Sequence, residues 1–374
     1  MSFQIPCPAE PGMPLDEVDT PALLLAMDAF DSNLDRLDAS LAGKKVRVRP
    51  HAKSHKCPEI ALRQMAHGAV GVCCQKVTEA EAMFAGGIPD VLISNQVVGD
   101  RKIERLVALA QRGRVSVLVD DPANVAVLNN AAAQKNVTLN VLVEINVGAN
   151  RCGVAPGEPA RILAGSVAAS RHLHFRGLHA YQGAAQHVRS AEERRGLIAR
   201  AVQMVRDTTT RLESDGIVCE IVTGAGTGTY LLEAASDVYN EIQPGSYVFM
   251  DADYGRNLDE DGKPVHSFSH SLFVWTTVMS HTTPGRAIVD AGLKALSVDS
   301  GMPLVTEPGA TYLGASDEHG VLRVDDPSRF RLGKKLRLIP GHCDPTVNLY
   351  DWIVGYRDDV VECVWPIAAR GALY

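Results

Sequence analysis

The sequence has no run of about 18 apolar residues, the length that a membrane-spanning helix requires. Its first residues lack the basic start and the apolar stretch of a secretory signal peptide. Its eight cysteines include no Cys-x-x-Cys pair and no spacing typical of a disulfide framework. We therefore expect no membrane span, and a cytoplasmic protein whose thiols are buried or free.

Positive charge is also in short supply. The 374 residues carry 44 acidic side chains against 37 lysines and arginines, which gives a formal net charge of -7. An acidic chain is disfavoured as a general nucleic-acid binder, because nucleic-acid phosphates require a basic surface. The length predicts one large globular domain with a smaller one attached.

Short β-rich runs alternate with helical patterns from residue 46 to about residue 250. The predicted strands are Val46–His51, Ala69–Cys74, Val91–Asn95, Arg114–Val119, Leu139–Ile145, Leu173–Tyr181, Cys219–Gly224 and Tyr247–Met250. The predicted helices between them include Lys76–Ala85, Asp100–Gln111, Pro122–Gln134 and Ala191–Ser214. This alternation predicts the α/β class, and it favours a (β/α)8 barrel over a doubly wound open sheet.

The pattern changes after residue 250, where short alternating runs predict a mainly β domain of roughly 120 residues. Its predicted strands are Phe273–Met279, Arg286–Asp290, Val321–Val324, Lys335–Ile339, Trp352–Tyr356 and Val360–Val364. Near the start, Thr20–Met27 is also strand-like, and Asp28–Leu41 has a helical face of leucines. We therefore assign residues 28–250 to the barrel and residues 1–27 with 251–374 to the β-domain.

Lys53 follows the first predicted barrel strand, in the segment Arg49-Pro-His-Ala-Lys-Ser-His-Lys56. Active sites of barrels lie at the C-terminal ends of their strands, where a lysine suits covalent chemistry with an aldehyde cofactor. The amine must be neutral to react, and its usual pKa is about 10.4. We expect the neighbouring cations and burial to lower that pKa. The alternative is a solvated basic loop.

Other polar side chains follow later strands. Arg151 comes after the fifth, and Tyr181 ends the sixth, with His187 shortly after it. Arg151 is either an anchor for an anionic oxygen of the cofactor ring or a surface cation. Tyr181 either packs beside that ring or is an ordinary half-buried side chain. His187 is either a proton carrier or a loop histidine.

A glycine-rich turn (residues 223–229, Thr-Gly-Ala-Gly-Thr-Gly-Thr) follows the seventh predicted strand and precedes a helix-forming segment. Backbone N–H groups at such a helix start favour a phosphate, and phosphate sites of barrels commonly follow strands seven and eight. We predict that Thr223, Gly224, Gly226 and Thr227 bind the cofactor. The alternative is a plain turn.

His342 and Asp344 lie in the segment Gly341-His-Cys-Asp-Pro345. If the strand from Lys335 extends that far, the two side chains share one face and Cys343 points away. An imidazole with a carboxylate suits Mn²⁺ or a similar divalent ion, and two protein ligands leave positions for substrate. The alternative is a turn before Pro345 in which both groups bond to backbone.

These segments, together with Pro-Gly-His-Cys-Asp-Pro at 340–345 and Gly-Ala-Gly-Thr-Gly-Thr-Tyr at 224–230, resemble the D-threonine aldolases. That family consists of metal-activated pyridoxal-phosphate enzymes of the alanine racemase fold type. The resemblance extends over essentially the whole chain. It implies that Lys53 forms the Schiff base with the cofactor and that His342 and Asp344 bind Mn²⁺, with Mg²⁺, Co²⁺ or Zn²⁺ as other choices.

The resemblance also implies reversible cleavage of D-threonine and other β-hydroxy-D-amino acids to glycine and an aldehyde. It places Arg151, Tyr181 and His187 in the active site, puts the 224–227 turn on the cofactor phosphate, and implies a homodimer. The related D-serine dehydratases bind zinc through a His-x-Cys pair, whereas here aspartate holds the third position, which favours an aldolase.

Three other functions share part of this sequence pattern. A dehydratase acting on D-serine or D-3-hydroxyaspartate would share much of this architecture and stays an alternative. A non-catalytic pyridoxal-phosphate-binding barrel is disfavoured by residues 252–374, because such proteins lack a C-terminal β-domain. Alanine racemase has both domains but does not need His342 and Asp344 as metal ligands.

Overall fold

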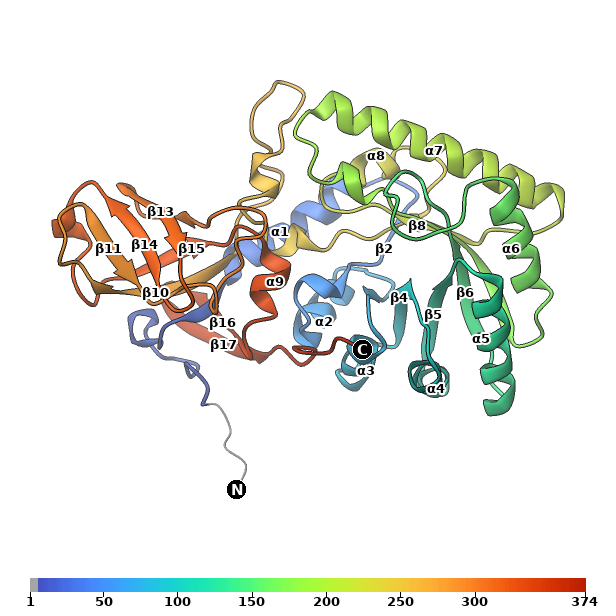
Figure 1. Cartoon of the computed structure of the whole chain (residues 1–374), viewed down its shortest axis with the longest axis horizontal. Coiled ribbons are helices and arrows are strands. Elements are labelled where there is room, and N and C mark those ends of the chain that lie inside the picture. The colour runs from blue at the N-terminus through green and yellow to red at the C-terminus, as the bar shows by residue number, and fades with distance from the viewer. Residues whose placement is uncertain (1–5) are drawn as a thin grey trace.

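The computed structural model describes residues 6–374, so the first five residues of the predicted N-terminal segment lie outside the described residues. The structure contains an eight-stranded sheet and a nine-stranded sheet. The two sheets lie at opposite ends of an elongated molecule, with the nine-stranded sheet at the left of Figure 1. Among the described residues, no helix combines the length and the apolarity needed to cross a membrane.

The eight-stranded sheet is parallel throughout, in the order β2-β9-β8-β7-β6-β5-β4-β3. Its strands are β2 (Arg47–Val48), β3 (Val72–Cys74), β4 (Asp90–Gln96), β5 (Arg114–Val119), β6 (Leu139–Glu144), β7 (Leu173–Ala180), β8 (Ile221–Gly224) and β9 (Glu241–Ile242). The N–H of Val70 donates to the carbonyl of Val48 at 2.9 Å, and that of Cys73 donates to Pro50 at 2.8 Å. These bonds connect the two end strands, so the sheet curls into a barrel and the predicted fold class is confirmed.

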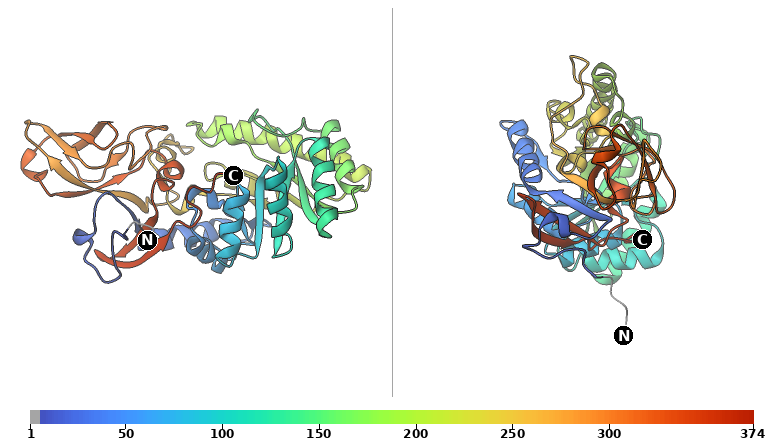
Figure 2. Two further views of the ribbon diagram at one scale, coloured as in Figure 1. Left: turned by 60° about the horizontal axis from the view of Figure 1, so that its bottom comes forward. Right: turned by 90° about the vertical axis from the view of Figure 1, so that its left-hand side faces the viewer.

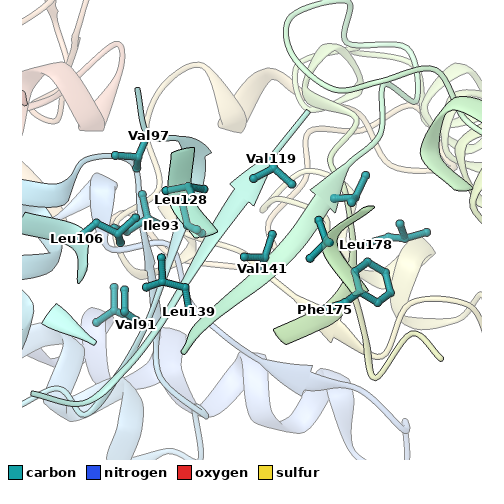
Figure 3. Close-up of a cluster of buried hydrophobic side chains, with 14 of the residues drawn as sticks. Val91, Ile93, Val97, Leu106, Val119, Leu128, Leu139, Val141, Phe175 and Leu178 are labelled. Atoms are coloured by element: carbon teal, nitrogen blue, oxygen red, sulfur yellow. The ribbon is translucent and has the colours of Figure 1, made fainter. Parts of the chain in front are cut away.

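Apolar side chains alternate between the two faces of the barrel sheet. Val91, Ile93 and Val141 pack on the outside against the helices, and all three are fully buried (Figure 3). Leu92 and Leu118 join a separate cluster from neighbouring strands on the other face. Each fully buried aliphatic side chain contributes about 1.5–3 kcal/mol. Burial on both faces explains why these strands have nearly continuous apolar sequences.

Helices follow the strands because local signals start them. In α5, Pro122 occupies the first turn and the Asp121 carboxylate accepts the N–H of Ala123 at 2.7 Å, a capping arrangement that satisfies an otherwise free donor. The helices are α1 (Met27–Leu41), α2 (Pro58–Ala66), α3 (Val77–Ala85), α4 (Asp100–Leu109), α5 (Pro122–Lys135), α6 (Glu158–Ala168), α7 (Ala191–Ser214), α8 (Tyr230–Ala234) and α9 (Cys343–Val347). Short 3-10 helices are η1 (Leu15–Glu17), η2 (Ala52–Ser54), η3 (Gly183–Ala185), η4 (Ser246–Val248), η5 (Tyr254–Arg256) and η6 (Pro327–Arg329).

The eighth barrel strand was predicted in the wrong place. The prediction was Tyr247–Met250, but the strand is β9, Glu241–Ile242, and residues 246–248 form η4. Tyr247 and Phe249 gave an apolar signal because they are buried side chains of the protein core. In β9, Glu241 is fully buried but binds Arg49 at 3.0 Å, so its charge hid the strand from pattern analysis.

The nine-stranded sheet comprises β1 (Ala22–Ala26), β10 (Leu272–Ser280), β11 (Arg286–Val289), β12 (Leu304–Val305), β13 (Ala310–Ala315), β14 (Gly320–Val324), β15 (Lys335–Ile339), β16 (Trp352–Arg357) and β17 (Val360–Pro366). Strand β1 runs antiparallel to β10 and parallel to β16, so the N-terminal strand joins the C-terminal sheet. Figure 2 shows this blue segment against the red strands. Strands β12 and β13 were not predicted.

Candidate active site

A cavity of about 140 Å³ opens where the barrel strands end. Its walls combine residues from the ends of β4 and β7 with residues that follow β2, β3, β6, β8 and β9. The lining residues are His51, Lys53, Gln75, Ser94, Arg151, His179, Tyr181, Ala225, Gly226, Thr227, Gln243, Gly245, Ser246 and Tyr254.

Five of the predicted cofactor residues line this cavity: Lys53, Arg151, Tyr181, Gly226 and Thr227. Arg151 and Tyr181 are neighbours, since the guanidinium carbon lies 6.0 Å from the centre of the Tyr181 ring. Strand ends far apart in sequence are thus brought to one rim, as the barrel prediction requires.

Thr223 and Gly224 are not among the lining residues. The Thr223 hydroxyl accepts a hydrogen bond from the Gln243 amide at 2.8 Å, inside the barrel wall. A Cβ at Gly224 would lie 2.3 Å from the carbonyl oxygen of Ala180, so glycine is needed there for close strand packing. These two residues shape the wall behind the cavity rather than its surface.

Lys53 lies on η2 and forms an ion pair with Asp344, which belongs to α9. Burial opposes the charged form of the amine, but attraction to the Asp344 carboxylate outweighs it and raises the pKa of Lys53. Burial likewise disfavours the Asp344 carboxylate, but the charge of Lys53 lowers its pKa to about 2. The expectation of a lowered lysine pKa is therefore wrong for the chain without cofactor.

The neighbouring cations do not repel Lys53 as expected, because each has its own partner. Arg49 binds Asp90 at 2.8 Å and Glu241 at 3.0 Å, and Lys56 binds Glu79 at 3.2 Å. These pairs neutralise the basic segment locally. The sequence shows the cations but not the acids, which come from distant strands and helices.

One predicted metal ligand, Asp344, belongs to this ion pair, and the other is His342, but the local geometry differs from the prediction. Strand β15 ends at Ile339, and residues 343–347 form helix α9 with His342 as the residue before it. The N–H of Cys343 donates to the carboxylate of Asp251 at 3.0 Å, which anchors the start of this helix. The prediction that His342 and Asp344 share one face of a strand is therefore wrong, because the chain forms a helix here whose start is held by Asp251.

The imidazole of His342 is held from one side. Its Nδ1 lies 2.8 Å from the carboxylate of Asp299, which leaves Nε2 as the nitrogen able to bind an ion. Asp344 contacts Lys53 through Oδ2, and its Oδ1 accepts a contact from the Cys343 thiol at 3.4 Å. Imidazole and carboxylate are donors that suit Mn²⁺ or a similar divalent ion, so the residues present fit such a metal.

His187 lies beside the cavity without lining it. Its Nδ1 contacts the Asp253 carboxylate at 2.5 Å, and its ring packs on Tyr254 with a centroid distance of 4.6 Å. Tyr254 is itself a lining residue. Burial lowers the pKa of His187, more than the Asp253 charge raises it. The imidazole is therefore neutral near pH 7 and able to accept a proton.

Two lining histidines were not predicted, although each lies two residues before a predicted residue. His51 precedes Lys53 and contacts Gln75 at 2.9 Å, and burial strongly lowers its pKa. His179 precedes Tyr181 at the end of β7. The alternation of strand side chains would have identified His179. Gln243 was missed because β9 was misplaced.

The glycine-rich turn fits a phosphate. Among residues 6–374, the N–H groups of Gly226 and Thr227 have no hydrogen-bond partner, and the Thr227 hydroxyl is buried without one. A Cβ at Gly226 would lie 2.5 Å from the side-chain oxygen of Gln186, so the backbone passes close to its support. Free donors at the cavity wall suit an anion.

Asp120, Glu144 and Cys152 form a separate group whose potential ligand atoms lie within 4.8 Å of one another. Asp120 accepts the N–H of Gly153 at 3.0 Å. Burial raises the pKa of Glu144, but the imidazole of His179, 3.5 Å from its carboxylate, helps to lower it. Through these contacts, Asp120 and Glu144 support the barrel rim.

The chain matches the family model described as alanine racemase, N-terminal domain, over residues 25–253, and a serine dehydratase domain model over residues 271–356. It is 47% identical to a D-threonine aldolase of Arthrobacter sp. over 369 residues, covering 98% of this chain and 97% of that protein. It is 46% identical to a 3-hydroxy-D-aspartate aldolase of Paracoccus denitrificans over 372 residues, covering 98% and 96%.

The solved structure of D-threonine aldolase from Filomicrobium marinum is also similar, with a TM-score of 0.95 and 50% identity over 98% of this chain and all of that chain (100%). Sequence and fold thus agree over both sheets. The chain therefore belongs to the alanine racemase-like family of aldehyde-lyases that includes D-threonine aldolase and 3-hydroxy-D-aspartate aldolase.

Proposed function

We propose that this enzyme uses pyridoxal phosphate and a divalent metal ion to cleave D-threonine and other β-hydroxy-D-amino acids reversibly to glycine and an aldehyde. One observation carries the proposal, the direct contact between Lys53 of the barrel rim and Asp344 of α9. An amine for the cofactor and a carboxylate for the metal are thus direct neighbours, close enough for a single small substrate to reach both.

Pyridoxal phosphate, when bound, supplies an electron sink for the charge that develops as the Cα–Cβ bond breaks. Lys53 would hold its aldehyde carbon, and the backbone N–H groups of Gly226 and Thr227 would hold its phosphate. Arg151 and Tyr181, which also line the cavity, would orient the ring. Thr223 and Gly224, also predicted as cofactor residues, would act through the position of the turn.

Cleavage of the Cα–Cβ bond requires removal of the proton from the β-hydroxyl. His187 would accept it, because the imidazole is neutral near pH 7 and Asp253 orients it. The ring contact with Tyr254 fixes His187 at the edge of the cavity.

His342 and Asp344 would bind the divalent ion, which when present supplies positive charge beside the β-hydroxyl. Mn²⁺ suits this donor pair, and Mg²⁺, Co²⁺ or Zn²⁺ are other choices. Position 344 holds an aspartate, where a His-x-Cys pair would have a cysteine. The neighbouring Cys343 is fully buried, and burial raises the pKa of its thiol. Hard oxygen ligation of this kind supports aldolase over dehydratase activity.

The test is incubation of the purified protein with D-threonine, pyridoxal phosphate and Mn²⁺, followed by product analysis. We expect glycine and acetaldehyde in equal amounts. A keto acid with ammonia would instead identify a dehydratase of D-serine or D-3-hydroxyaspartate. Parallel incubation with 3-hydroxy-D-aspartate, the substrate in the name of the Paracoccus relative, shows which of the two substrates is cleaved faster.

We further propose a cytoplasmic homodimer, on the resemblance to this family. We also propose residues 28–250 as the cofactor-binding domain and residues 1–27 with 251–374 as the domain that carries the metal ligands. Sedimentation of the purified protein, with and without the cofactor, would measure the assembly. Monomers under both conditions would contradict the homodimer.

A further inference from the structure

Glu233 is a buried acid that none of the steps above uses. It lies on α8, directly after the glycine-rich turn, and only 1% of its surface is exposed. A carboxyl group this deeply buried requires either a partner cation or a neutral state. Glu233 lies behind the candidate phosphate site, so its charge would affect the binding of an anion there.

A chain of hydrogen bonds connects Glu233 to the turn. The Thr229 hydroxyl donates to Oε1 of Glu233 at 2.8 Å, and the Gln186 amide donates to the Thr229 hydroxyl at 2.9 Å. The side-chain oxygen of Gln186 then accepts the N–H of Gly228 at 3.0 Å. Gln186 is fixed in turn, because Asn257 donates to its backbone carbonyl at 2.9 Å. The turn therefore rests on a relay that ends at Glu233.

Among the described residues, Oε2 of Glu233 has no hydrogen-bond partner and no ion pair reaches this carboxyl group. Burial raises its pKa to about 8, against the hydrogen bond from Thr229, which lowers it. The charge of Glu233 would act on Tyr181 and Tyr239, whose own pKa values are raised, chiefly by burial.

Charged side chains on the packed elements have other partners. Arg206 of α7 donates to the carbonyl of Ser236 at 3.3 Å, and Glu241 of β9 binds Arg49 at 3.0 Å. The Tyr230 hydroxyl donates to Ser40 of α1 at 3.1 Å. Among the described residues, none of these groups forms an ion pair with Glu233.

We propose that Glu233 is a positioning residue for the cofactor phosphate: its buried carboxyl group holds the glycine-rich turn through Thr229 and Gln186. This inference rests on the proposed function, because it takes the turn to be the phosphate site. It assigns a purpose to an acid that would be costly to bury as a charge. Ionisation of Glu233 would add a negative charge behind an anionic ligand and weaken its binding.

The test compares wild type with Glu233→Gln, which keeps the size and removes the ionisation. Pyridoxal phosphate is titrated into the cofactor-free form of each protein, and the dissociation constant is read from the absorption of the bound cofactor. Titrations are made well below and above the Glu233 pKa of about 8. At the lower pH the two proteins should bind within about twofold of each other, because both side chains are neutral.

At the higher pH, wild type should lose about tenfold more affinity than Glu233→Gln, because only wild type gains the buried charge. The surface variant Glu213→Gln is the matched control and should follow wild type at both pH values, since Glu213 is exposed. Thr229→Val should weaken binding at the lower pH by interrupting the relay, whereas Thr229→Ser should retain it. This pair also serves if Glu233→Gln folds poorly.

Parallel pH dependence in wild type and Glu233→Gln would overturn this inference while leaving the proposed function intact. Weaker binding by Glu233→Gln at the lower pH would also overturn it, because the acid would then act as a carboxylate. If wild type binds no pyridoxal phosphate at either pH, the proposed function fails together with the inference.

Discussion

The barrel rim and the segment around α9 contribute opposite charges to one site, but they hold them by different means. Lys53 follows β2 on a 3-10 helix whose backbone is continuous with the barrel. His342 and Asp344 depend on polar side chains, through Asp299 and through the bond from Cys343 to Asp251. The rim is thus fixed by the fold, whereas the metal half is fixed by a few hydrogen bonds. Changes to the two halves should therefore have separable effects.

Removal of the rim amine should have the largest effect. Lys53→Ala should abolish the visible absorption band of bound pyridoxal phosphate and reduce turnover by more than about a thousandfold. The reason is that no other lysine lines the cavity in the part of the chain described. Absorption spectroscopy of the purified variant measures the band. Lys44→Ala, at an exposed position, is the control and should retain both properties; a band that survives in Lys53→Ala would remove Lys53 from its role.

Removal of the metal half should stop turnover but spare the cofactor. EDTA, or the change Asp344→Asn, should lower activity by about a hundredfold or more, because positive charge at the β-hydroxyl is lost. The visible absorption band of bound pyridoxal phosphate should remain, since Lys53 and the glycine-rich turn belong to the barrel. Titration calorimetry with Mn²⁺ should show lost binding in Asp344→Asn and normal binding in the exposed control Asp317→Asn. Full activity in chelator would refute the metal assignment.

The same contrast explains how much the sequence could predict. Lys53, Arg151 and Tyr181 were identified because a parallel barrel brings strand ends to one rim whatever the local detail. His342 and Asp344 were identified as residues, but their geometry was not. The start of α9 is anchored by Asp251, which lies 92 residues away in sequence. A local pattern cannot contain a contact of that kind.

Electrostatics were the least predictable feature of the site. The basic segment from Arg49 to Lys56 suggested a lowered lysine pKa, yet its cations are paired with acids from other elements. Asp344 then reverses the expected direction for Lys53. The pKa of a residue depends on the partners that the fold supplies, and the sequence lists those partners without their distances.

His187 contacts Asp253 and packs on Tyr254 beside the cavity, so its protonation can be tested through Asp253. Asp253 raises the pKa of His187, so Asp253→Asn should lower it further and also loosen the ring. A base must be neutral, so activity is lost as pH falls through its pKa. The acid limb of kcat/KM should therefore move to lower pH, with kcat reduced by about tenfold or more. The pH profiles of wild type and variant measure this. An unmoved acid limb would exclude His187 as the base.

The smallest expected effect distinguishes Thr227, which lines the cavity, from Thr223, which lies in the wall behind it. Thr227→Val removes a buried hydroxyl that has no partner among the described residues, so binding of pyridoxal phosphate should weaken by about tenfold. Thr223→Val removes a hydroxyl that already bonds to Gln243 at 2.8 Å. It should lower the free energy of unfolding by about 1 kcal/mol and leave the dissociation constant within about twofold. Titration and thermal unfolding of both variants provide the comparison. Equal losses of affinity would mean that Thr223 contacts the cofactor directly and that the cavity extends deeper into the barrel than its lining residues indicate.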